Sequence, residues 1–256
     1  EFEVYHVVFS GKIEYDFAGK LFHLEHLKDK SNSWWSRSKR FFALKEFFAN
    51  HNFDYVIDFR TKQHFLQEFI IHNFVYPKFI QTIHSYKLKS YLPRNIFLAK
   101  LLYKNCKQFI TVSQGINNKV SSKYTFVPSQ VIYNSIDFEF ISEKIKEPIS
   151  DDFQYVLSAG SMHKNVKQFD KLIACYAKSI LPSKNIKLII LGEGKLKNKW
   201  IKLVESMNLQ DLVIFKGNVM NPFRYYKRAL FTISTSKYEG MPMVLLESLA
   251  CETPII

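Results

Sequence analysis

The segment "KYEGMPMVLLESLACETPII", residues 237–256, places two glutamates eight positions apart in a mostly apolar stretch. Glu239 stands directly before Gly240, and Glu247 lies in an apolar run where a charge is costly to bury without a partner. Eight helical steps would separate the two carboxylates by about 12 Å along the axis. Since carboxylates accept hydrogen bonds from neighbouring hydroxyls, this spacing suits a ligand with hydroxyls at both ends. Alternatively, Glu239 is a loop charge and Glu247 pairs with a lysine.

Between the two glutamates, the sequence predicts the start of a helix. Pro242 is expected in its first turn, because the ring fixes a helical φ and the missing N–H would be unpaired there. Met241, Met243 and Val244 would then offer backbone N–H groups to an anion, and Gly240 would let a ligand approach the backbone closely. The resulting order of hydroxyls, anion and hydroxyls is that of a nucleotide sugar, with its sugar, diphosphate and ribose.

The elements that must position these residues alternate between strands and helices along the chain. This alternation predicts an α/β protein with parallel sheets covered by helices on both faces. In the first half, we expect strands at 4–9, 54–59, 78–84, 108–113 and 129–134, and helices at 34–50 and 95–107. In the second half, we expect strands at 153–160, 212–217 and 230–236 and from 253 onward, and a strand followed by a glycine loop at 186–194. We expect helices at 167–180, 195–209, 221–229 and 242–250.

A polar, acidic stretch, residues 137–152, separates the two series. We expect it to be a linker with local helix between an N-terminal domain, 1–136, and a C-terminal domain, 153–256. The prediction is therefore two Rossmann-like domains with a cleft between them. In open parallel sheets, ligands bind beyond the carboxyl ends of the strands. Four glycines follow a predicted strand or the short loop after one: Gly160, Gly192, Gly217 and Gly240.

The net charge of +13 is unevenly distributed. No acidic residue occurs between Glu68 and Asp137, where nine basic residues do: Lys78, Lys87, Lys89, Arg94, Lys100, Lys104, Lys107, Lys119 and Lys123. Such a zone favours an anionic partner, which is a nucleic acid, an anionic membrane or a phosphorylated substrate. The alternative is an ordinary lysine-rich surface. Because no nucleic-acid-binding module is recognisable, nucleic acid is not expected as a partner.

Other residue patterns narrow the class of protein. The three cysteines, Cys106, Cys175 and Cys251, fit neither a disulfide framework nor a metal site, which favours a reducing cytoplasm. No apolar run reaches the roughly 18 residues that a membrane-spanning helix needs. The sequence has no D-x-D pair of acids, and Asp151 and Asp152 fall in the linker. We therefore expect neither a metal nor any other cofactor.

The closing segment resembles the E-x7-E motif of retaining GT-B glycosyltransferases of family 4, the glycosyl transferases group 1. The matching positions are Glu239, Gly240, Pro242, Glu247, Ala250, Pro254 and Ile256, while Ser248 and Glu252 replace the usual Ala and Gly. Further segments resemble the family in the same order: "FITVSQGINNKV", "VIYNSID", "VLSAGSMHKNVKQFDKLIACYAK", "KLIILGEGKLKNKW" and "LVIFKGNV". The resemblance covers most of the chain and implies a GT-B fold.

The resemblance also implies roles for the residues of the closing segment. In the family, the first glutamate, here Glu239, contacts the donor sugar and the second, Glu247, contacts the ribose. The backbone amides between them contact the distal phosphate. The match to "LVIFKGNV" adds Gly217, Asn218 and Val219 to the expected donor site.

A further basic position is expected to neutralise the donor diphosphate. Lys167 fits the family's lysine, and Lys164 is a candidate for a second positive charge. Ser161 follows Gly160 where the family often has arginine, which puts the affinity for phosphate in question. His84, in "QTIHSY", resembles a histidine near the family's cleft, with a polar role at the acceptor or the sugar, although a structural role is an equal alternative.

The implied reaction is retaining transfer of a sugar from a nucleotide-diphosphate sugar, a UDP-sugar, to a glycan or lipid-linked acceptor. Such enzymes build cell-surface polysaccharide or lipopolysaccharide, which implies a cytoplasmic protein in peripheral contact with the anionic inner face of the membrane. The alternatives are a degenerate GT-B accessory subunit and a GT-B sugar-nucleotide epimerase. Compared with the family pattern, the chain is expected to lack the first strand and the closing helices.

Overall fold

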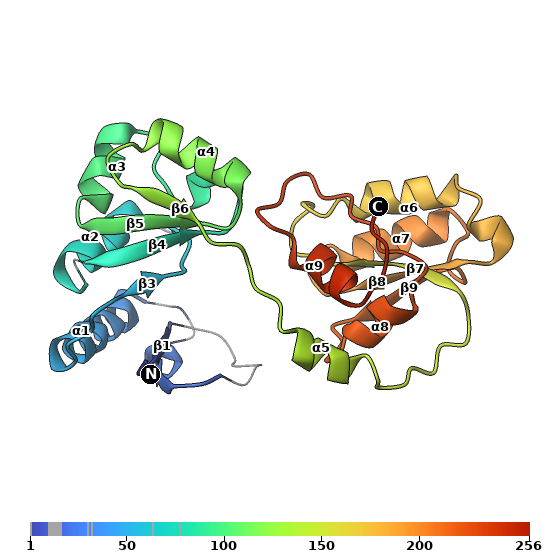
Figure 1. The fold of residues 1–256 in the computed structure, drawn as a ribbon, viewed down its shortest axis with the longest axis horizontal. Coiled ribbons are helices and arrows are strands. Elements are labelled where there is room, and N and C mark those ends of the chain that lie inside the picture. The colour runs from blue at the N-terminus through green and yellow to red at the C-terminus, as the bar shows by residue number, and fades with distance from the viewer. Residues whose placement is uncertain (1, 10–16, 30, 32, 63, 77) are drawn as a thin grey trace. The chain divides into compact units, whose positions relative to one another are not determined.

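The computed structural model describes residues 2–9, 17–29, 31, 33–62, 64–76 and 78–256. The chain forms two compact units, each of mixed helices and strands (Figure 1). The first contains residues 1–82, 89–110 and 120–130, and the second contains residues 83–88, 111–119 and 131–256.

The first half of the chain builds a four-stranded sheet with the order β3-β4-β5-β6. Its strands are β3 (Ile57–Asp58), β4 (Phe79–Ile83), β5 (Cys106–Thr111) and β6 (Ser129–Val131), of which β3 and β4 pair in parallel. Two other strands, β1 (Tyr5–Val8) and β2 (Lys20–His23), form a separate parallel pair. The helices are α1 (Trp34–Asn50), α2 (Phe65–Phe74), α3 (Ile96–Tyr103) and α4 (Gln114–Lys123), with short 3-10 helices η1 (Glu25–Leu27) and η2 (Leu88–Ser90).

The second unit contains a parallel sheet in which the strand order reverses. Its strands β7 (Tyr155–Ala159), β8 (Lys187–Leu191) and β9 (Val213–Gly217) lie in the order β7-β8-β9. On the other side of β7, Leu157 bridges Thr232, and Thr232 bridges Ile255, both in parallel. The chain thus adds strands in one direction from β7 and later in the other. Ligands of such sheets bind at this switch point, beyond the carboxyl ends of the strands.

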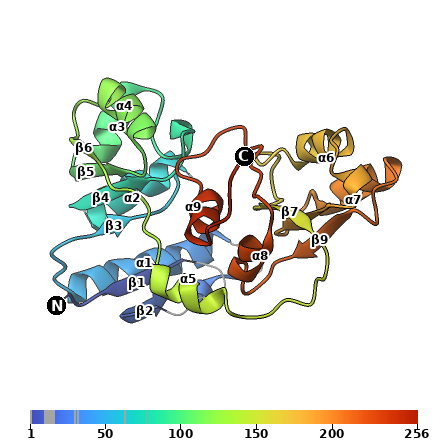
Figure 2. The same ribbon diagram turned by 45° about the vertical axis from the view of Figure 1, so that its right-hand side comes forward.

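Helices cover both faces of the second unit's sheet, as the sequence predicts. They are α5 (Phe138–Lys144), α6 (Phe169–Ala177), α7 (Lys197–Ser206), α8 (Phe223–Arg228), α9 (Met243–Ala250) and the short η3 (Pro182–Lys184). Figures 1 and 2 show α6 and α7 on one side of the sheet, and α8 and α9 on the other. Separate apolar clusters fill the two sides: Phe169 and Trp200 lie in the first, and Tyr155, Tyr226 and Cys251 in the second.

The boundaries of several elements differ from the prediction. The helix predicted for 34–50 is α1, with the same bounds. The helix predicted for 95–107 ends at Tyr103, and β5 begins at Cys106 instead of at 108, because Cys106 turns inward and Lys107 outward as in a strand. The strand predicted for 230–236 is reduced to backbone pairing around Thr232. Within the predicted linker, α5 supplies the expected local helix. The sequence did not predict α2 or β2.

Candidate functional site

The loops that follow β7 and β8 meet through their backbones at the carboxyl end of the second unit's sheet. A Cβ atom on Gly192, which has φ of +120°, would lie 2.1 Å from the carbonyl oxygen of Gly160. One on Gly194 would lie 2.2 Å from the carbonyl carbon of Met162. The amide of Gly192 also donates to the carbonyl of Gly217, at 2.8 Å. Only glycine fits at 192 and 194, and these contacts fix the edge where a ligand is expected.

Lys167 crosses this edge and joins it to the segment that follows Thr232. A Cβ atom on Gly160 would lie 2.5 Å from the Cε atom of Lys167, so the lysine stem lies directly against the glycine. Its Nζ atom donates to Oε1 of Glu239 at 2.8 Å, and the two side chains are 18% and 28% exposed. Thr235 Oγ1 donates to the carbonyl oxygen of Lys167 at 2.8 Å. Two residues that the sequence assigned to the site therefore form an ion pair at the switch point, and this pairing was not predicted.

The helix predicted between the two glutamates begins one residue later than expected. Pro242 is the N-cap of α9, with φ of −73° and an extended ψ of 109°, and the helix begins at Met243. The prediction of Pro242 in the first turn was wrong, because its carbonyl already accepts the first helical bonds, from Leu245 and Leu246, while its ψ stays extended. The amides of Met243 and Val244 precede any intrahelical acceptor and remain available to an anion.

Two other segments of the second unit fix the loop that leads into α9. A Cβ atom on Gly240 would lie 2.2 Å from the carbonyl oxygen of His84, so only glycine fits there. The side-chain amide of Asn134 donates to the carbonyl of Met241 at 3.3 Å, and the Asn134 backbone N–H donates to Met241 Sδ at 3.2 Å. Asn134 was not among the predicted site residues, although it lies in the family-like segment "VIYNSID". Burial lowers the pKa of His84, which favours its neutral form.

Glu247 is a partly buried carboxyl group on α9. Burial raises its pKa, against the opposing effects of a hydrogen bond from Tyr226 and the nearby charge of Lys167. Tyr226 comes from α8, is buried, and has its own pKa raised, first by burial and then by Glu247. The Tyr226 hydroxyl is therefore the hydrogen-bond partner of the Glu247 carboxyl group. The charge of Lys167, which pairs with Glu239, also acts on Glu247. No spacing signal in the sequence pointed to Tyr226.

The remaining predicted residues lie at the rim of this site or beside it. Ser161 and Lys164 are exposed in the loop between β7 and α6. A Cβ atom on Gly217, at the end of β9, would lie 2.7 Å from a carboxylate oxygen of Glu193. Asn218 is exposed, whereas Val219 packs against the apolar cluster under α8 and α9. Among the described residues, no side-chain hydrogen bond or ion pair joins Lys164 or Asn218 to the Lys167–Glu239 pair.

One group of potential metal ligands occurs in the part of the chain that the structure describes. It consists of Asp58, Glu68 and His72, all buried in the first unit. Arg60 already occupies its centre, with Nη2 2.6 Å from Asp58 Oδ2 and 2.9 Å from Glu68 Oε2. The hydroxyl of Tyr76 donates to Asp58 Oδ2 at 2.8 Å. Since a guanidinium supplies the positive charge, the group is complete as an ion cluster.

Residues 139–256 match the family model of the Glycosyl transferases group 1. This part of the chain belongs to the group 1 glycosyltransferases. The chain is also 34% identical, over 164 residues, to the N-acetylgalactosamine-N,N'-diacetylbacillosaminyl-diphospho-undecaprenol 4-alpha-N-acetylgalactosaminyltransferase of Campylobacter jejuni, covering 63% of this chain and 44% of the relative. It is 29% identical to the O-antigen chain mannosyltransferase RfbU of Salmonella typhimurium, covering 62% of this chain and 44% of the relative. The chain thus spans less than half the length of these curated relatives.

Solved glycosyltransferases share the fold. WaaG, a glycosyltransferase involved in lipopolysaccharide biosynthesis, aligns with a TM-score of 0.66 at 17% identity, covering 99% of this chain and 72% of WaaG. HepE of Anabaena, in complex with UDP and glucose, aligns with a TM-score of 0.66 at 15% identity, covering 93% of this chain and 66% of HepE. The GT-B fold predicted from the sequence is thereby confirmed.

Proposed function

We propose that the complete protein is a retaining glycosyltransferase that transfers a hexosyl-type sugar from a UDP-sugar to a glycan or lipid-linked acceptor. Its product would be a cell-surface polysaccharide or lipopolysaccharide, built at the cytoplasmic face of the membrane. The Lys167–Glu239 pair carries the proposal, because it places a cation and a hydroxyl-binding carboxylate together at the switch point of a parallel sheet. Among the described residues, no helix is long and apolar enough to cross a membrane.

The comparisons support the donor and acceptor classes. HepE was solved with UDP and glucose, and the pneumococcal O-GlcNAc transferase GtfA with UDP and GlcNAc. The Campylobacter relative is named for an acceptor linked to diphospho-undecaprenol. For this chain, UDP-sugar and lipid-linked acceptor are accordingly the proposed classes.

In the proposed mechanism, the site stabilises the charge that develops on the departing diphosphate. The ammonium of Lys167 and the amides of Met243 and Val244 are preorganised donors, which act without reorganisation when charge appears. Glu239 would accept hydrogen bonds from sugar hydroxyls, and we assign it no covalent step. Glu247 would accept from the ribose hydroxyls.

The role of His84 and the retention of the anomeric configuration are two parts of the proposal that rest on the family resemblance. Neutral His84 would act as a polar group at the acceptor or sugar. Retention of the anomeric configuration can be tested by proton NMR of the transferred sugar during the first turnovers. A product with inverted configuration would contradict that part of the proposal.

Calorimetry with UDP tests the donor site of the complete protein. Replacing Glu247 with alanine removes an ionised acceptor for ribose hydroxyls, and we expect UDP to bind about tenfold more weakly. Glu239→Ala should reduce sugar transfer far more than it reduces affinity for free UDP, since free UDP lacks the transferred sugar that Glu239 is proposed to contact. Glu205→Ala, an exposed position on α7, is the matched control and should change neither. Unchanged UDP affinity in Glu247→Ala would exclude its ribose role.

A catalytically degenerate accessory subunit is a second candidate, favoured by exposed Ser161 at the position where the family often has arginine. Incubating the complete protein with UDP-sugars and with acceptors separates the candidates. Transfer supports the enzyme, and binding with no turnover supports the accessory subunit. Epimerised UDP-sugar formed without an acceptor would instead identify a sugar-nucleotide epimerase.

A further inference from the structure

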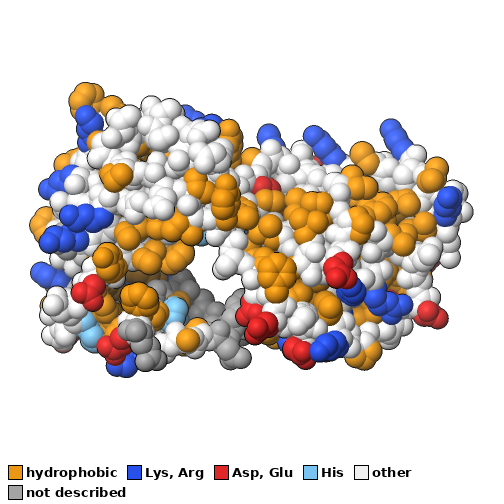
Figure 3. All heavy atoms as spheres, viewed as in Figure 1, with side chains coloured by type: hydrophobic (Ala, Val, Ile, Leu, Met, Phe, Trp, Pro, Cys, Tyr) orange, Lys and Arg blue, Asp and Glu red, His pale blue; other side chains and the backbone are white. Residues whose placement is uncertain are grey.

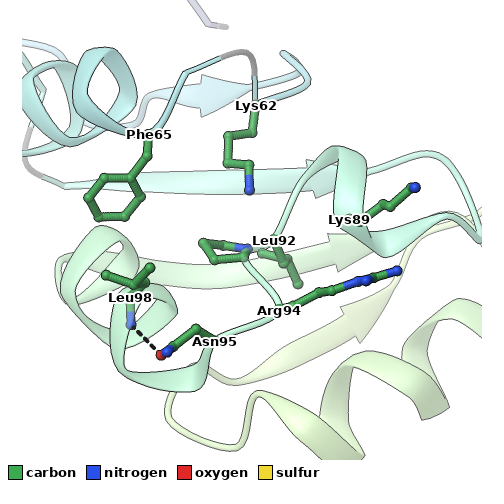
Figure 4. A pocket seen from close by; sticks show the side chains of 8 residues that line it. Lys62, Phe65, Lys89, Leu92, Arg94, Asn95 and Leu98 are labelled. Atoms are coloured by element: carbon green, nitrogen blue, oxygen red, sulfur yellow. Dashed lines mark hydrogen bonds between the residues drawn. The ribbon is translucent and has the colours of Figure 1, made fainter.

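A pocket of about 410 Å³ opens in the first unit, and its lining residues are not part of the candidate donor site. Three basic side chains line it, Lys62, Lys89 and Arg94, and no acidic side chain of the described residues does. Its apolar lining includes Phe65, Leu92 and Leu98 (Figure 4). The volume lies in the range of sites for small molecules.

The positions of the basic residues follow from the sheet of this unit. Lys62 lies in the loop after β3, and Lys89 lies in η2, which follows β4. The backbone N–H of Lys62 donates to the carbonyl of Ser90 at 2.8 Å, so the two loops are joined. Because β3 and β4 are neighbouring parallel strands, the pocket lies where ligands of such sheets bind, beyond the carboxyl ends.

The positive charges of the pocket have no ion-pair partner in the part of the chain that the structure describes. Among the described residues, none of Lys62, Lys89 and Arg94 forms an ion pair. The acids closest in sequence to Lys62, Asp58 and Glu68, already bind Arg60. Burial lowers the pKa of Lys62, with only a partial opposing effect from Glu68, so a bound anion would favour its charged form.

The pocket divides into an apolar side and a basic side. In Figure 4, Phe65 and Leu98 lie on one side, and Lys89 and Arg94 lie on the other. The apolar side continues onto α3, where Phe97 is 78% exposed and Leu98 is 43% exposed. Figure 3 shows hydrophobic and basic side chains next to each other on the face of the first unit that it displays.

Recognition of an anion here must come from the basic side chains. The side-chain oxygen of Asn95 accepts from the amides of Phe97 at 2.9 Å and Leu98 at 3.2 Å, which caps the start of α3 (Figure 4). With those amides occupied, the fitting ligand is an anion held by ammonium and guanidinium groups, next to an apolar group on Phe65 and Leu98.

We propose that this pocket binds the diphosphate of an amphiphile, with Lys62, Lys89 and Arg94 on the phosphates and Phe65 and Leu98 on the hydrocarbon. The inference rests on the proposed function and deepens it, because such a ligand is the phosphorylated, lipid-linked part of an acceptor.

Calorimetry of the complete protein with geranyl diphosphate and with inorganic pyrophosphate tests the basic side of the pocket. The triple variant K62Q/K89Q/R94Q should bind geranyl diphosphate at least tenfold more weakly than the wild type. The control K100Q/K104Q/K107Q removes the same charge from exposed positions outside the pocket and should stay within twofold. Equal losses in both triples, with geranyl diphosphate or with phosphatidylglycerol vesicles, would mean general attraction to anions and would overturn the proposal.

A second pair of variants tests the apolar side. Leu98 and Leu101 are 43% and 44% exposed on the same helix, but only Leu98 lines the pocket. Leu98→Gln should weaken geranyl diphosphate about fivefold and leave pyrophosphate unchanged, while Leu101→Gln should change neither. Equal affinity of the wild type for the two probes would show a site for free phosphate and would overturn the assignment of an amphiphile.

Binding of UDP, measured on the same samples, separates this inference from the proposed function. The donor residues Lys167, Glu239 and Glu247 lie in the second unit, so the triple variant should bind UDP as the wild type does. If UDP binds and geranyl diphosphate does not, the pocket proposal fails while the donor site stands. If only geranyl diphosphate binds, the donor site fails and the pocket stands.

Discussion

The two units each hold a cation against carboxylates, but in opposite settings. In the first unit, Arg60 binds Asp58 and Glu68, whose side chains are only 3% and 4% exposed. In the second unit, Lys167 binds Glu239 through one contact, and both side chains are partly exposed, at 18% and 28%. The first cluster is buried and already holds a guanidinium, whereas the second keeps a partly exposed cation at the carboxyl end of a parallel sheet. Exposure of the charged groups, more than the presence of an ion pair, distinguishes the proposed binding site from the structural cluster.

The electrostatics of the first cluster fit a structural role. Burial would raise the pKa of Asp58, but hydrogen bonds from His72 and Arg60 and the charge of Arg60 hold it well below its usual value. The Tyr76 hydroxyl donates to the same carboxylate, and the side-chain amide of Gln81 donates to the backbone carbonyl of Asp58 at 2.9 Å. This network ties β3 to β4 and to the end of α2, so removing one member leaves buried partners unpaired.

The largest effect is expected from Asp58→Ala, which tests the structural side of the comparison. Removing one of the two carboxylates that bind Arg60, together with the acceptor of the Tyr76 hydroxyl, should lower the free energy of unfolding by about 3–5 kcal/mol. Urea denaturation measures this, with exposed Asp54→Ala as the control, expected within about 0.5 kcal/mol of the wild type. A loss as small as that of the control would show that the cluster does not stabilise the fold.

The next effect should appear in catalysis, and it tests the functional side. Lys167→Gln should lower sugar transfer by about 10²–10³-fold, since a preorganised charge opposite the diphosphate is lost. Its effect on stability should stay below about 1 kcal/mol, because a partly exposed pair contributes little. Steady-state kinetics and denaturation on the same sample check both, with exposed Lys178→Gln on the end of α6 as the control. A large loss of stability with normal kinetics would reverse the assignment.

A smaller effect concerns the pH dependence at Glu247. Because burial raises its pKa in the folded state, folding binds protons there, and stability falls as the pH rises from about 4.5 through the folded-state pKa. Glu247→Gln stays neutral, so its unfolding temperature should exceed that of the wild type by about 2–4 °C at pH 7. The difference should shrink below pH 4.5. Thermal scans from pH 4 to pH 8 measure it, and a difference that does not depend on pH would contradict the role of ionisation.

The smallest effect is expected at Glu252, which forms an ion pair with Lys227 at the surface. Its φ of +59° is left-handed, and its side chain is 81% exposed. The family has glycine there, which avoids the strain of this conformation. Glu252→Gly should therefore raise the urea concentration at the midpoint of unfolding slightly, as urea denaturation can measure, despite losing the ion pair. Glu252→Ala is the control, since it loses the pair but keeps the strain and should bring no gain.

The sequence predicted the second unit better than the first. Strands β7, β8 and β9 combine buried apolar residues with a glycine at or directly after the end, so both their type and their position were predictable. Helix α2 was missed because its apolar residues, "FLQEFIIHNF", include buried Glu68 and His72, whose burial depends on partners outside the helix. A local pattern cannot show that Arg60 and Asp58 will neutralise them.

The site was predicted as a set of residues but not as a set of contacts. Glu239, Glu247 and Lys167 were chosen from motif positions, and the structure places them at one sheet edge. The Lys167–Glu239 bond joins residues 72 positions apart, and the Tyr226 partner of Glu247 comes from another helix. Such contacts depend on the reversal of strand order, which no local spacing encodes. The pocket between Lys62 and Leu98 likewise needs two loops brought together by neighbouring strands.

The close backbone approach of Gly192 to Gly160, and of Gly194 to Met162, has a consequence for protein engineering. Because these loops meet through main-chain atoms, the frame of the edge does not depend on the exposed side chains carried between them. A combinatorial library at Ser161, His163 and Lys164 could therefore vary the chemistry of the rim while the fold is retained. The same library extended to the glycines would consist mostly of misfolded clones. Selection for altered donor preference should accordingly recover substitutions between the glycines and none at them.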